Sequence, residues 1–288
     1  MIKFNKIQPA PTIVFIHIPR TGGTTFHELA AKQYGREQVR QFTRADIEAW
    51  AQPRDNCAAQ WRFVSGHIGF EFDRIITQPH VYITFLRNPV TRIPSVYEYI
   101  RTNPAHTHHA TVTSQNLSLQ EFIERGVSVA NIDNGMTRLL CGLPNSAREV
   151  GFGECTREML EAAKKNLRQR IAVVGLTEDF DASLVLMRRC LDWSSPLYKR
   201  MNSTNTSLAK AVTPVEVRLI EKYNVLDCEL YAYARTLFHR QASRLDPLFR
   251  LRVGYFQYKN RVRTQNPKAF MRLRRFESKR IARWLDLT

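Results

Sequence analysis

The 288-residue sequence lacks the features that mark several common classes of protein. No apolar run approaches the roughly 20 residues that a membrane-spanning helix needs. Residues 1–20 do not follow the layout of a secretory signal peptide, because His17 interrupts their longest apolar stretch. The five cysteines form no C-x-x-C pair, which argues against a zinc site and for a reducing compartment. We therefore predict a cytoplasmic protein without a signal peptide or a transmembrane helix.

Acidic residues are scarce: 26 Asp and Glu stand against 43 Lys and Arg, which gives a net charge of +17. The excess lies near the end of the chain, since residues 235–283 hold fifteen basic and two acidic residues, whereas residues 1–234 hold 28 and 23. A content of 43% hydrophobic residues excludes a disordered chain. We predict a near-neutral domain over residues 1–238, a basic and mainly helical C-terminal extension over residues 239–288, and a polyanionic partner.

Short apolar runs rich in β-branched residues predict buried strands over residues 12–18, 62–65, 81–86 and 171–174. A pattern of helical spacing follows three of these runs, and capping boxes at Ser118 and Thr213 mark two further helix starts. Alternating strands and helices predict an α/β fold in three layers, with a central parallel sheet.

The unusual polar residues follow the predicted strands. The Gly22-Gly23 loop, His67 and Arg87 each come just past the carboxyl end of a run. In an open α/β sheet ligands bind at that edge, so we expect these groups to share one site.

The loop from Arg20 to Thr25 has the composition of an anion site. Its two glycines let backbone N–H groups approach an anion, and the following helix presents its positive N-terminus. Arg20 adds a permanent charge, and Thr21, Thr24 and Thr25 add hydroxyl donors. The alternative is a tight turn with Thr24 or Thr25 as the N-cap. The loop is not a Walker A loop, because G-x-x-x-x-G-K-[ST] does not occur in the chain.

A second set of groups follows the other strands. Arg87 ends one run and Ser95 lies eight residues further on, so together they can grip a second anion. Two separated anion sites on one edge suggest a ligand with two phosphates. Beside such a ligand His67 is the natural general base, although a lone histidine can equally be a packed structural residue. We interpret His17 as a structural residue in the middle of its strand. Three histidines in a polar loop are interpreted as surface residues: His106, His108 and His109.

These residues carry a resemblance to a known family. Phe15–Phe26 resembles the 5′-phosphosulfate loop of sulfotransferases that use 3′-phosphoadenosine 5′-phosphosulfate (PAPS), and Phe85–Tyr97 resembles their 3′-phosphate motif. The closest resemblance is to the branch that sulfates heparan at 2-O and 6-O hydroxyls, where Ser65–His67 is similar to the segment of the catalytic histidine. The resemblance covers about residues 12–238. Three later segments are also similar to the family: Asn134–Leu140, Val174–Glu178 and Leu226–Tyr231.

The resemblance implies a P-loop-like sulfotransferase fold and transfer of a sulfuryl group from PAPS to a hydroxyl of an oligo- or polysaccharide, without a metal. His67 would act as the base, and Arg20 with the loop through Thr25 would bind the phosphosulfate. Arg87 and Ser95 would hold the 3′-phosphate, and residues 202–206 would lie near the adenine. The chain departs from the family at Arg20, where lysine is usual, so the part of this residue in stabilising the leaving group is open.

The basic extension has an apolar stripe that predicts an amphipathic helix. Such a helix docks on the domain, lies on an anionic membrane at its inner face, or faces an anionic polysaccharide. Two other functions stay open, a P-loop-like kinase and a nucleic-acid- or polyanion-binding protein that uses the basic tail. No motif for base readout occurs, so we expect no specific nucleic acid. The stripe consists of Phe270, Leu273, Phe276, Ile281, Trp284 and Leu285.

Overall fold

The computed structural model describes residues 10–50, 61–76, 78–143, 146–194, 196–198, 212–245, 247–266, 268 and 270–271. Three features of the sequence lie outside these residues: Cys57, the predicted adenine segment 202–206, and all of the apolar stripe except Phe270.

A parallel β-sheet of five strands forms the centre of the described chain, in the order β2-β3-β1-β4-β5. All five residues of β1 are buried, as expected for a strand with helices on both faces. The predicted α/β class with a central parallel sheet is thereby confirmed. The strands are β1 (Thr12–Ile16), β2 (Val39–Phe42), β3 (Phe63–Gly66), β4 (His80–Leu86) and β5 (Ile171–Leu176).

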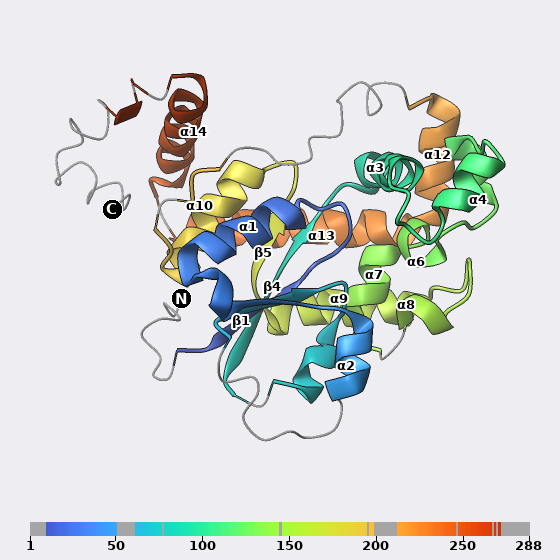
Figure 1. Ribbon diagram of the computed structural model, residues 1–288, viewed down its shortest axis with the longest axis horizontal. Helices are drawn as coiled ribbons and strands as arrows, with labels where there is room; N and C mark the ends of the chain where they lie inside the picture. Colours follow the sequence, from blue (N-terminus) through green and yellow to red (C-terminus); the bar gives the residue numbers. More distant parts are fainter. Residues whose placement is uncertain are drawn as a thin grey trace.

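Helices flank the sheet on both sides and extend beyond its carboxyl edge (Figure 1). Both predicted capping boxes are present, at the starts of α5 and α12. The α-helices described are α1 (Gly23–Tyr34), α2 (Arg44–Trp50), α3 (Pro89–Thr102), α4 (His109–Ser114), α5 (Leu119–Glu124), α6 (Val129–Ile132), α7 (Gly135–Leu140), α8 (Ser146–Glu149), α9 (Arg157–Gln169), α10 (Phe180–Leu191), α12 (Pro214–Tyr223), α13 (Val225–Leu245) and α14 (Phe249–Gln265). Two short 3₁₀ helices are η2 (Arg36–Gln38) and η4 (Phe70–Arg74).

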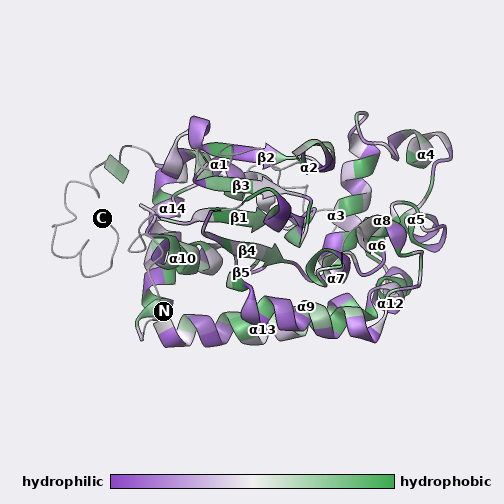
Figure 2. Ribbon diagram, turned by 90° about the horizontal axis from the view of Figure 1, so that it is seen from below, coloured by the Kyte–Doolittle hydropathy of each residue, from purple (hydrophilic) through white to green (hydrophobic). Residues whose placement is uncertain are grey.

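The interior has two hydrophobic clusters. The larger one surrounds the sheet, and the strands appear mostly hydrophobic in Figure 2 while α9 and α13 alternate between polar and apolar residues. The smaller one lies among α3, α4, α5 and α12 and includes Ile93, Val112, Phe122 and Ile220. This second cluster holds α3 beyond the edge of the sheet, and α3 is the helix that follows Arg87.

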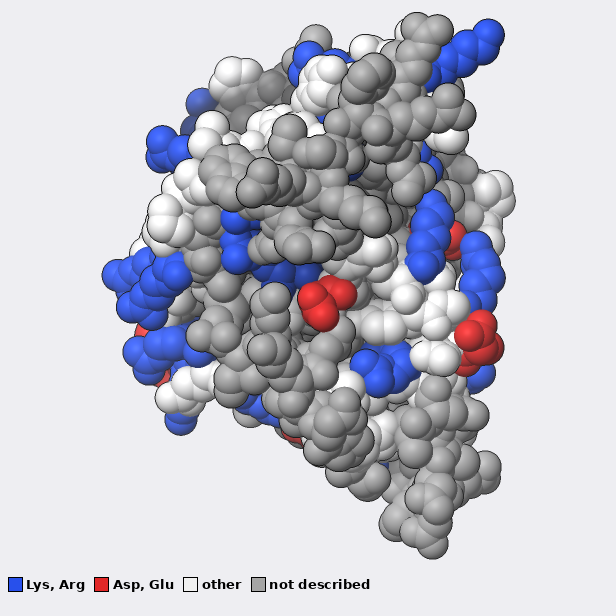
Figure 3. Space-filling view, turned by 90° about the vertical axis from the view of Figure 1, so that its left-hand side faces the viewer, with Lys and Arg blue, Asp and Glu red and all other residues white. Residues whose placement is uncertain are grey.

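The C-terminal part of the described chain is helical and basic. The predicted domain boundary at residue 238 falls inside α13, so dividing the chain there stays a prediction. Lys and Arg side chains are spread over the face on the side of α14, with few acidic side chains among them (Figure 3). In the portion of the chain that the structure describes, no helix combines the length and apolar character that crossing a membrane requires.

Candidate active site

The strand register brings the predicted histidine beside the loop. Ile16 pairs with Gly66, and the amide of His17 donates to the carbonyl of Gly66 over 2.9 Å. The next residue of each strand therefore lies at the same edge, and the rings of His17 and His67 are 4.4 Å apart. The interpretation of His17 as a mid-strand residue was wrong, because β1 ends at Ile16 and the half-buried His17 belongs to the site.

The Gly-Gly loop leads into α1 without a capping side chain. Gly22 is the N-cap, with a left-handed φ of 88° that glycine adopts without strain. Gly22 has no side chain that could accept from the first-turn amides, and the first turn has no acidic residue. The alternative with Thr24 or Thr25 as N-cap is therefore wrong. An uncapped helix start with its positive end toward the sheet edge is suited to an anion.

Two contacts fix the position of this loop. A Cβ at Gly23 would lie 1.9 Å from Nε2 of His17, so the imidazole fills the space that any other residue needs. The hydroxyl of Thr21 donates to the carbonyl of Ile18 over 2.8 Å, and the hydroxyl of Thr177 donates to the carbonyl of Thr21 over 2.9 Å. The loop is thus held by the segments that follow β1 and β5 and by the imidazole of His17.

Arg20 joins the two predicted anion motifs. Its Nε donates to Oγ of Ser95 over 3.0 Å, and its backbone carbonyl accepts from Nη1 of Arg87, also over 3.0 Å. Its guanidinium lies 4.9 Å from the ring centroid of Tyr99, one helical turn after Ser95. The two predicted anion motifs are therefore joined by direct hydrogen bonds, and two separate anion sites on this edge stay a prediction.

Neither arginine of this site forms an ion pair with a carboxylate within the described chain. Burial lowers the pKa of Arg87 to about 10 while the nearby Glu178 carboxylate acts in the opposite direction, and burial also lowers the pKa of Arg20. Both guanidinium groups stay charged at neutral pH. Two cations beside the uncapped start of α1 fit a ligand with two anionic groups, as PAPS has.

His67 has the geometry of a general base. Its Nδ1 lies 2.7 Å from the backbone carbonyl of His17, and because a carbonyl only accepts, Nδ1 carries the proton and Nε2 has the free lone pair. Desolvation by the surrounding protein lowers the pKa of His67, although the side chain keeps contact with solvent. The imidazole is therefore neutral at pH 7, the form that accepts a proton.

The three histidines after α3, which were interpreted as surface residues, are each partly exposed. The ring of His106 lies edge-on to Tyr99, with centroids 5.9 Å apart, and Nδ1 of His109 is 2.9 Å from the carbonyl of Ile100.

A buried arginine, Arg92, contacts the residue just before the Arg20–Thr25 loop. The sequence patterns did not identify this arginine. Arg92 in α3 is fully buried (0% exposed), and its Nη1 lies 3.5 Å from the carbonyl of Pro19, the residue before Arg20. Its Nη2 donates to the carbonyl of Asn131 over 2.6 Å and forms an ion pair with Asp227 over 3.6 Å.

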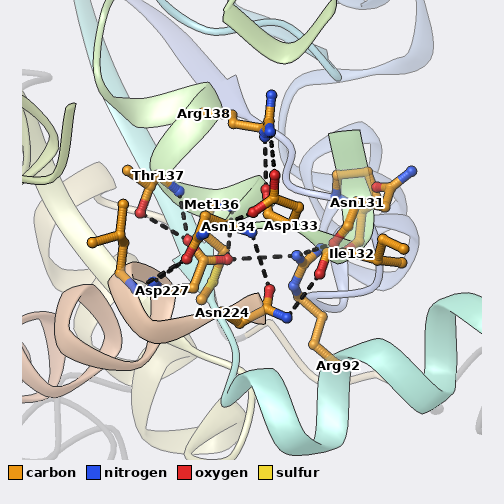
Figure 4. A network of polar contacts seen from close by, with 12 residues as sticks. Arg92, Asn131, Ile132, Asp133, Asn134, Met136, Thr137, Arg138, Asn224 and Asp227 are labelled. Atoms are coloured by element: carbon orange, nitrogen blue, oxygen red, sulfur yellow. Dashed lines mark hydrogen bonds and ion pairs between the residues drawn. The ribbon is translucent and has the colours of Figure 1, made fainter. Parts of the chain in front are cut away.

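Asp227 extends this contact into a network that joins three helices (Figure 4). Its carboxylate accepts from the amides of Met136 and Thr137 over 3.0 and 2.8 Å, and from the hydroxyl of Thr137 over 2.8 Å. Nearby, Asn134 accepts from two amides at the start of α13. The network fixes α3 against α7 and α13. Because Ser95 lies in α3, the network also fixes the position of Ser95.

A parallel sheet with an anion-binding loop between its first strand and first helix is the architecture of the sulfotransferases. Comparison with known proteins narrows the class: the model of the galactose-3-O-sulfotransferase family matches residues 4–264, and the chain belongs to this family. The predicted enzyme class, a sulfotransferase that acts on a carbohydrate, is thereby confirmed.

Three relatives are similar over most of the chain. Heparan-sulfate 6-O-sulfotransferase 1 of Homo sapiens is 28% identical, covering 80% of this chain and 66% of the relative. Heparan-sulfate 6-O-sulfotransferase 2 of Gallus gallus is 28% identical, covering 82% and 69%. Heparan-sulfate 6-O-sulfotransferase 3 of Homo sapiens is 26% identical, covering 83% and 60%. The matched region spans about two thirds of the length of these relatives.

Proposed function

We propose that this chain transfers a sulfuryl group from PAPS to a hydroxyl of an anionic polysaccharide. The observation that carries the proposal is the interlock of Arg20 with Ser95 and Arg87. It brings two arginines, neither with a carboxylate partner among the described residues, to the uncapped start of α1. A nucleotide with a 5′-phosphosulfate and a 3′-phosphate has the charges that this arrangement binds.

The loop would hold the 5′ side of the donor. Amides from Gly22 to Thr24 face the anion at the start of α1, and Arg20, Thr21 and Thr25 contribute charge and hydroxyl groups around it. Arg87 and Ser95 would bind the 3′-phosphate. PAPS, when bound, supplies the activated sulfuryl group. Preorganised donors of this kind stabilise the charge that develops during transfer. The donors come from the chain itself, and we expect transfer to be unchanged by a metal chelator.

His67 would take the proton of the acceptor hydroxyl. The His17 carbonyl fixes its tautomer, so that Nε2 accepts the proton while Nδ1 keeps its own. The proton then leaves to solvent, with which the imidazole is in contact. A base placed in this way contributes about 10²–10⁴-fold to a rate.

Charge supports a polysaccharide as the acceptor. The relatives named above are heparan-sulfate sulfotransferases, and the chain carries a net charge of +17. Basic side chains on the face near α14 favour a polyanion over a neutral sugar (Figure 3). Contact of the extension with a membrane stays a prediction, because residues 272–288 lie outside the described chain.

Thermal unfolding tests the donor without an acceptor. The ligand is adenosine 3′,5′-bisphosphate (PAP), the product left after transfer, compared with ATP and with buffer. At 1,000 times its Kd a ligand stabilises the folded state by about 4 kcal/mol, which raises the Tm by several degrees. We expect a shift with PAP and little with ATP, followed by transfer of labelled sulfate to heparan-type chains. A shift with ATP alone would instead favour a kinase.

A further inference from the structure

We propose that Glu178 is a positioning residue that sets the geometry of the 3′-phosphate site and so makes binding depend on that phosphate. The inference rests on the proposed function, because the 3′-phosphate is the group that this site would hold. Glu178 lies two residues after the end of β5 and follows the sheet edge that carries Arg87.

One carboxylate oxygen of Glu178 holds the start of α3. Its Oε1 accepts from the amide of Asn88 over 3.0 Å and lies 3.1 Å from Oγ1 of Thr91. Thr91 Oγ1 in turn accepts from Nε of Arg87 over 3.1 Å. The path from Glu178 through Thr91 therefore ends on the guanidinium that would bind the phosphate.

The other oxygen is fixed from a distant helix. The hydroxyl of Tyr231 in α13 donates to Oε2 of Glu178 over 2.8 Å. Burial raises the pKa of the Tyr231 phenol, so this donor keeps its proton at neutral pH. Glu178 thus has partners on both oxygens and a single orientation.

Thr177, the residue before Glu178, connects the end of β5 to the Arg20–Thr25 loop. The hydroxyl of Thr177 donates to the carbonyl of Thr21, and it also lies 3.2 Å from the carbonyl of Leu86. The pair Thr177-Glu178 therefore contacts both anion motifs and sets the distance between them. A ligand that spans the two motifs depends on this distance more than a ligand that occupies one.

Two possible effects of Glu178, repulsion by its charge and positioning of Arg87, predict opposite changes in ligand affinity when Glu178 is removed. A carboxylate beside a phosphate site repels the ligand, so its removal would strengthen binding if charge were its main effect. If its main effect is to position Arg87, its removal weakens binding, and only for ligands that carry the 3′-phosphate. The sign of the change therefore decides between the two.

The test compares the Kd of PAP with that of adenosine 5′-phosphosulfate, which lacks the 3′-phosphate, by calorimetry on the full chain. We expect Glu178→Ala to raise the Kd of PAP about tenfold, equal to about 1.4 kcal/mol. The Kd of adenosine 5′-phosphosulfate should rise less than twofold. Glu178→Gln keeps an acceptor for Asn88 and recovers most of the affinity. Glu229→Ala on the surface of α13 removes the same charge away from the site and changes neither ligand.

The outcomes separate this inference from the proposed function. If the unaltered protein does not bind PAP, the proposed function fails. If it binds PAP and Glu178→Ala binds PAP equally or more tightly, or loses both ligands alike, the positioning role is overturned. Should Glu178→Ala fail to fold, Tyr231→Phe removes only the donor to Oε2. This variant is expected to raise the Kd of PAP two- to threefold without affecting that of adenosine 5′-phosphosulfate. An unchanged Kd of PAP would contradict the positioning role of Glu178.

Discussion

Arg87 donates from Nη1 to the backbone carbonyl of Arg20, 3.0 Å away, and Arg20 has the left-handed φ of 65° that a non-glycine residue rarely adopts. A side chain from the second anion motif thus stabilises a strained backbone conformation in the first. Such a conformation costs of order 1–3 kcal/mol and persists only where surrounding contacts hold it. The two candidate anion motifs are therefore coupled before any ligand binds.

Replacing Arg87 by alanine tests the second anion site. The substitution removes a guanidinium from the 3′-phosphate position and a support of the loop. We expect PAP to bind at least tenfold more weakly, with a smaller loss for adenosine 5′-phosphosulfate. Arg101→Ala, at the exposed C-terminal end of α3, is the matched control and leaves both affinities unchanged. Equal losses for the two ligands in Arg87→Ala would argue against a 3′-phosphate at this arginine.

Replacing His67 by alanine tests the base. We expect transfer to fall by about 10²–10⁴-fold while PAP binds about as tightly as before, because the imidazole acts on the acceptor and not on the nucleotide. His239→Ala, at an exposed position of α13, should leave the rate unchanged. A His67→Ala protein with full transfer activity would show that another group accepts the proton.

The pH dependence of transfer follows from the lowered pKa of His67. Burial favours the neutral imidazole, with the bond to the His17 carbonyl acting in the opposite direction, so the pKa lies below its ordinary value of 6.5. We expect the acid limb of kcat/KM to have its midpoint below pH 6.5. A midpoint above pH 6.5 would assign the ionisation to a group other than His67.

Stability should change in the same direction. Burial also lowers the pKa of His17 and His27, so the folded state binds fewer protons than the unfolded chain. Their contribution is present above pH 6.5 and is lost as the pH falls through the folded-state values, so the Tm falls on acidification. A Tm that does not fall between pH 6.5 and lower pH would contradict this contribution.

Gly23 tests the packing between the loop and His17. In Gly23→Ala the new methyl group would meet Nε2 of His17 at 1.9 Å, so the imidazole or the helix start must move. We expect a lower Tm and weaker PAP binding. Gly254→Ala in α14 adds the same group where no atom lies within 4 Å, and it should stabilise the helix by up to about 1 kcal/mol. Similar behaviour of the two variants would refute the steric explanation.

Asp227 tests the buried network. Asp227→Ala leaves the buried Arg92 guanidinium without its ion-pair partner and two buried amides without their acceptor. Breaking a buried pair in this way costs about 3–5 kcal/mol, which lowers the Tm by roughly 10 °C. Glu161→Ala, in an exposed pair with Lys164, should change the Tm little. Equal Tm values for the two variants would show that the network is not needed for stability.

Local patterns were sufficient for the parts of the fold with strong signals. The run around Val14 is apolar throughout, and the S-x-x-E and T-P-V-E motifs specify their own hydrogen bonds. Strand β2 was missed, because Val39–Phe42 is short, and its two central residues are exposed and polar. An edge strand of this kind gives no apolar run and little alternation.

The long-range contacts of the site were beyond sequence patterns. Four site residues could be identified because each follows a strand or begins a helix, and Ser95 because it lies eight residues after Arg87. The four are Arg20, Gly23, His67 and Arg87. Arg92 and Asp227 lie 135 positions apart, and nothing local in either segment indicates that they meet in the interior. Strand order likewise depends on packing between segments, so neither the interlock at Arg20 nor the role of Glu178 could be derived from spacing.

The hydrogen bond from Thr177 to Thr21 joins residues 156 positions apart, and Tyr231 contributes its contact later still. During synthesis at about 5–20 residues per second, the phosphosulfate loop leaves the ribosome on the order of ten to forty seconds before α13. A nascent chain in that interval has the loop but lacks the contact that Tyr231 makes with Glu178. We therefore expect binding of the donor nucleotide to appear only after α13 has packed.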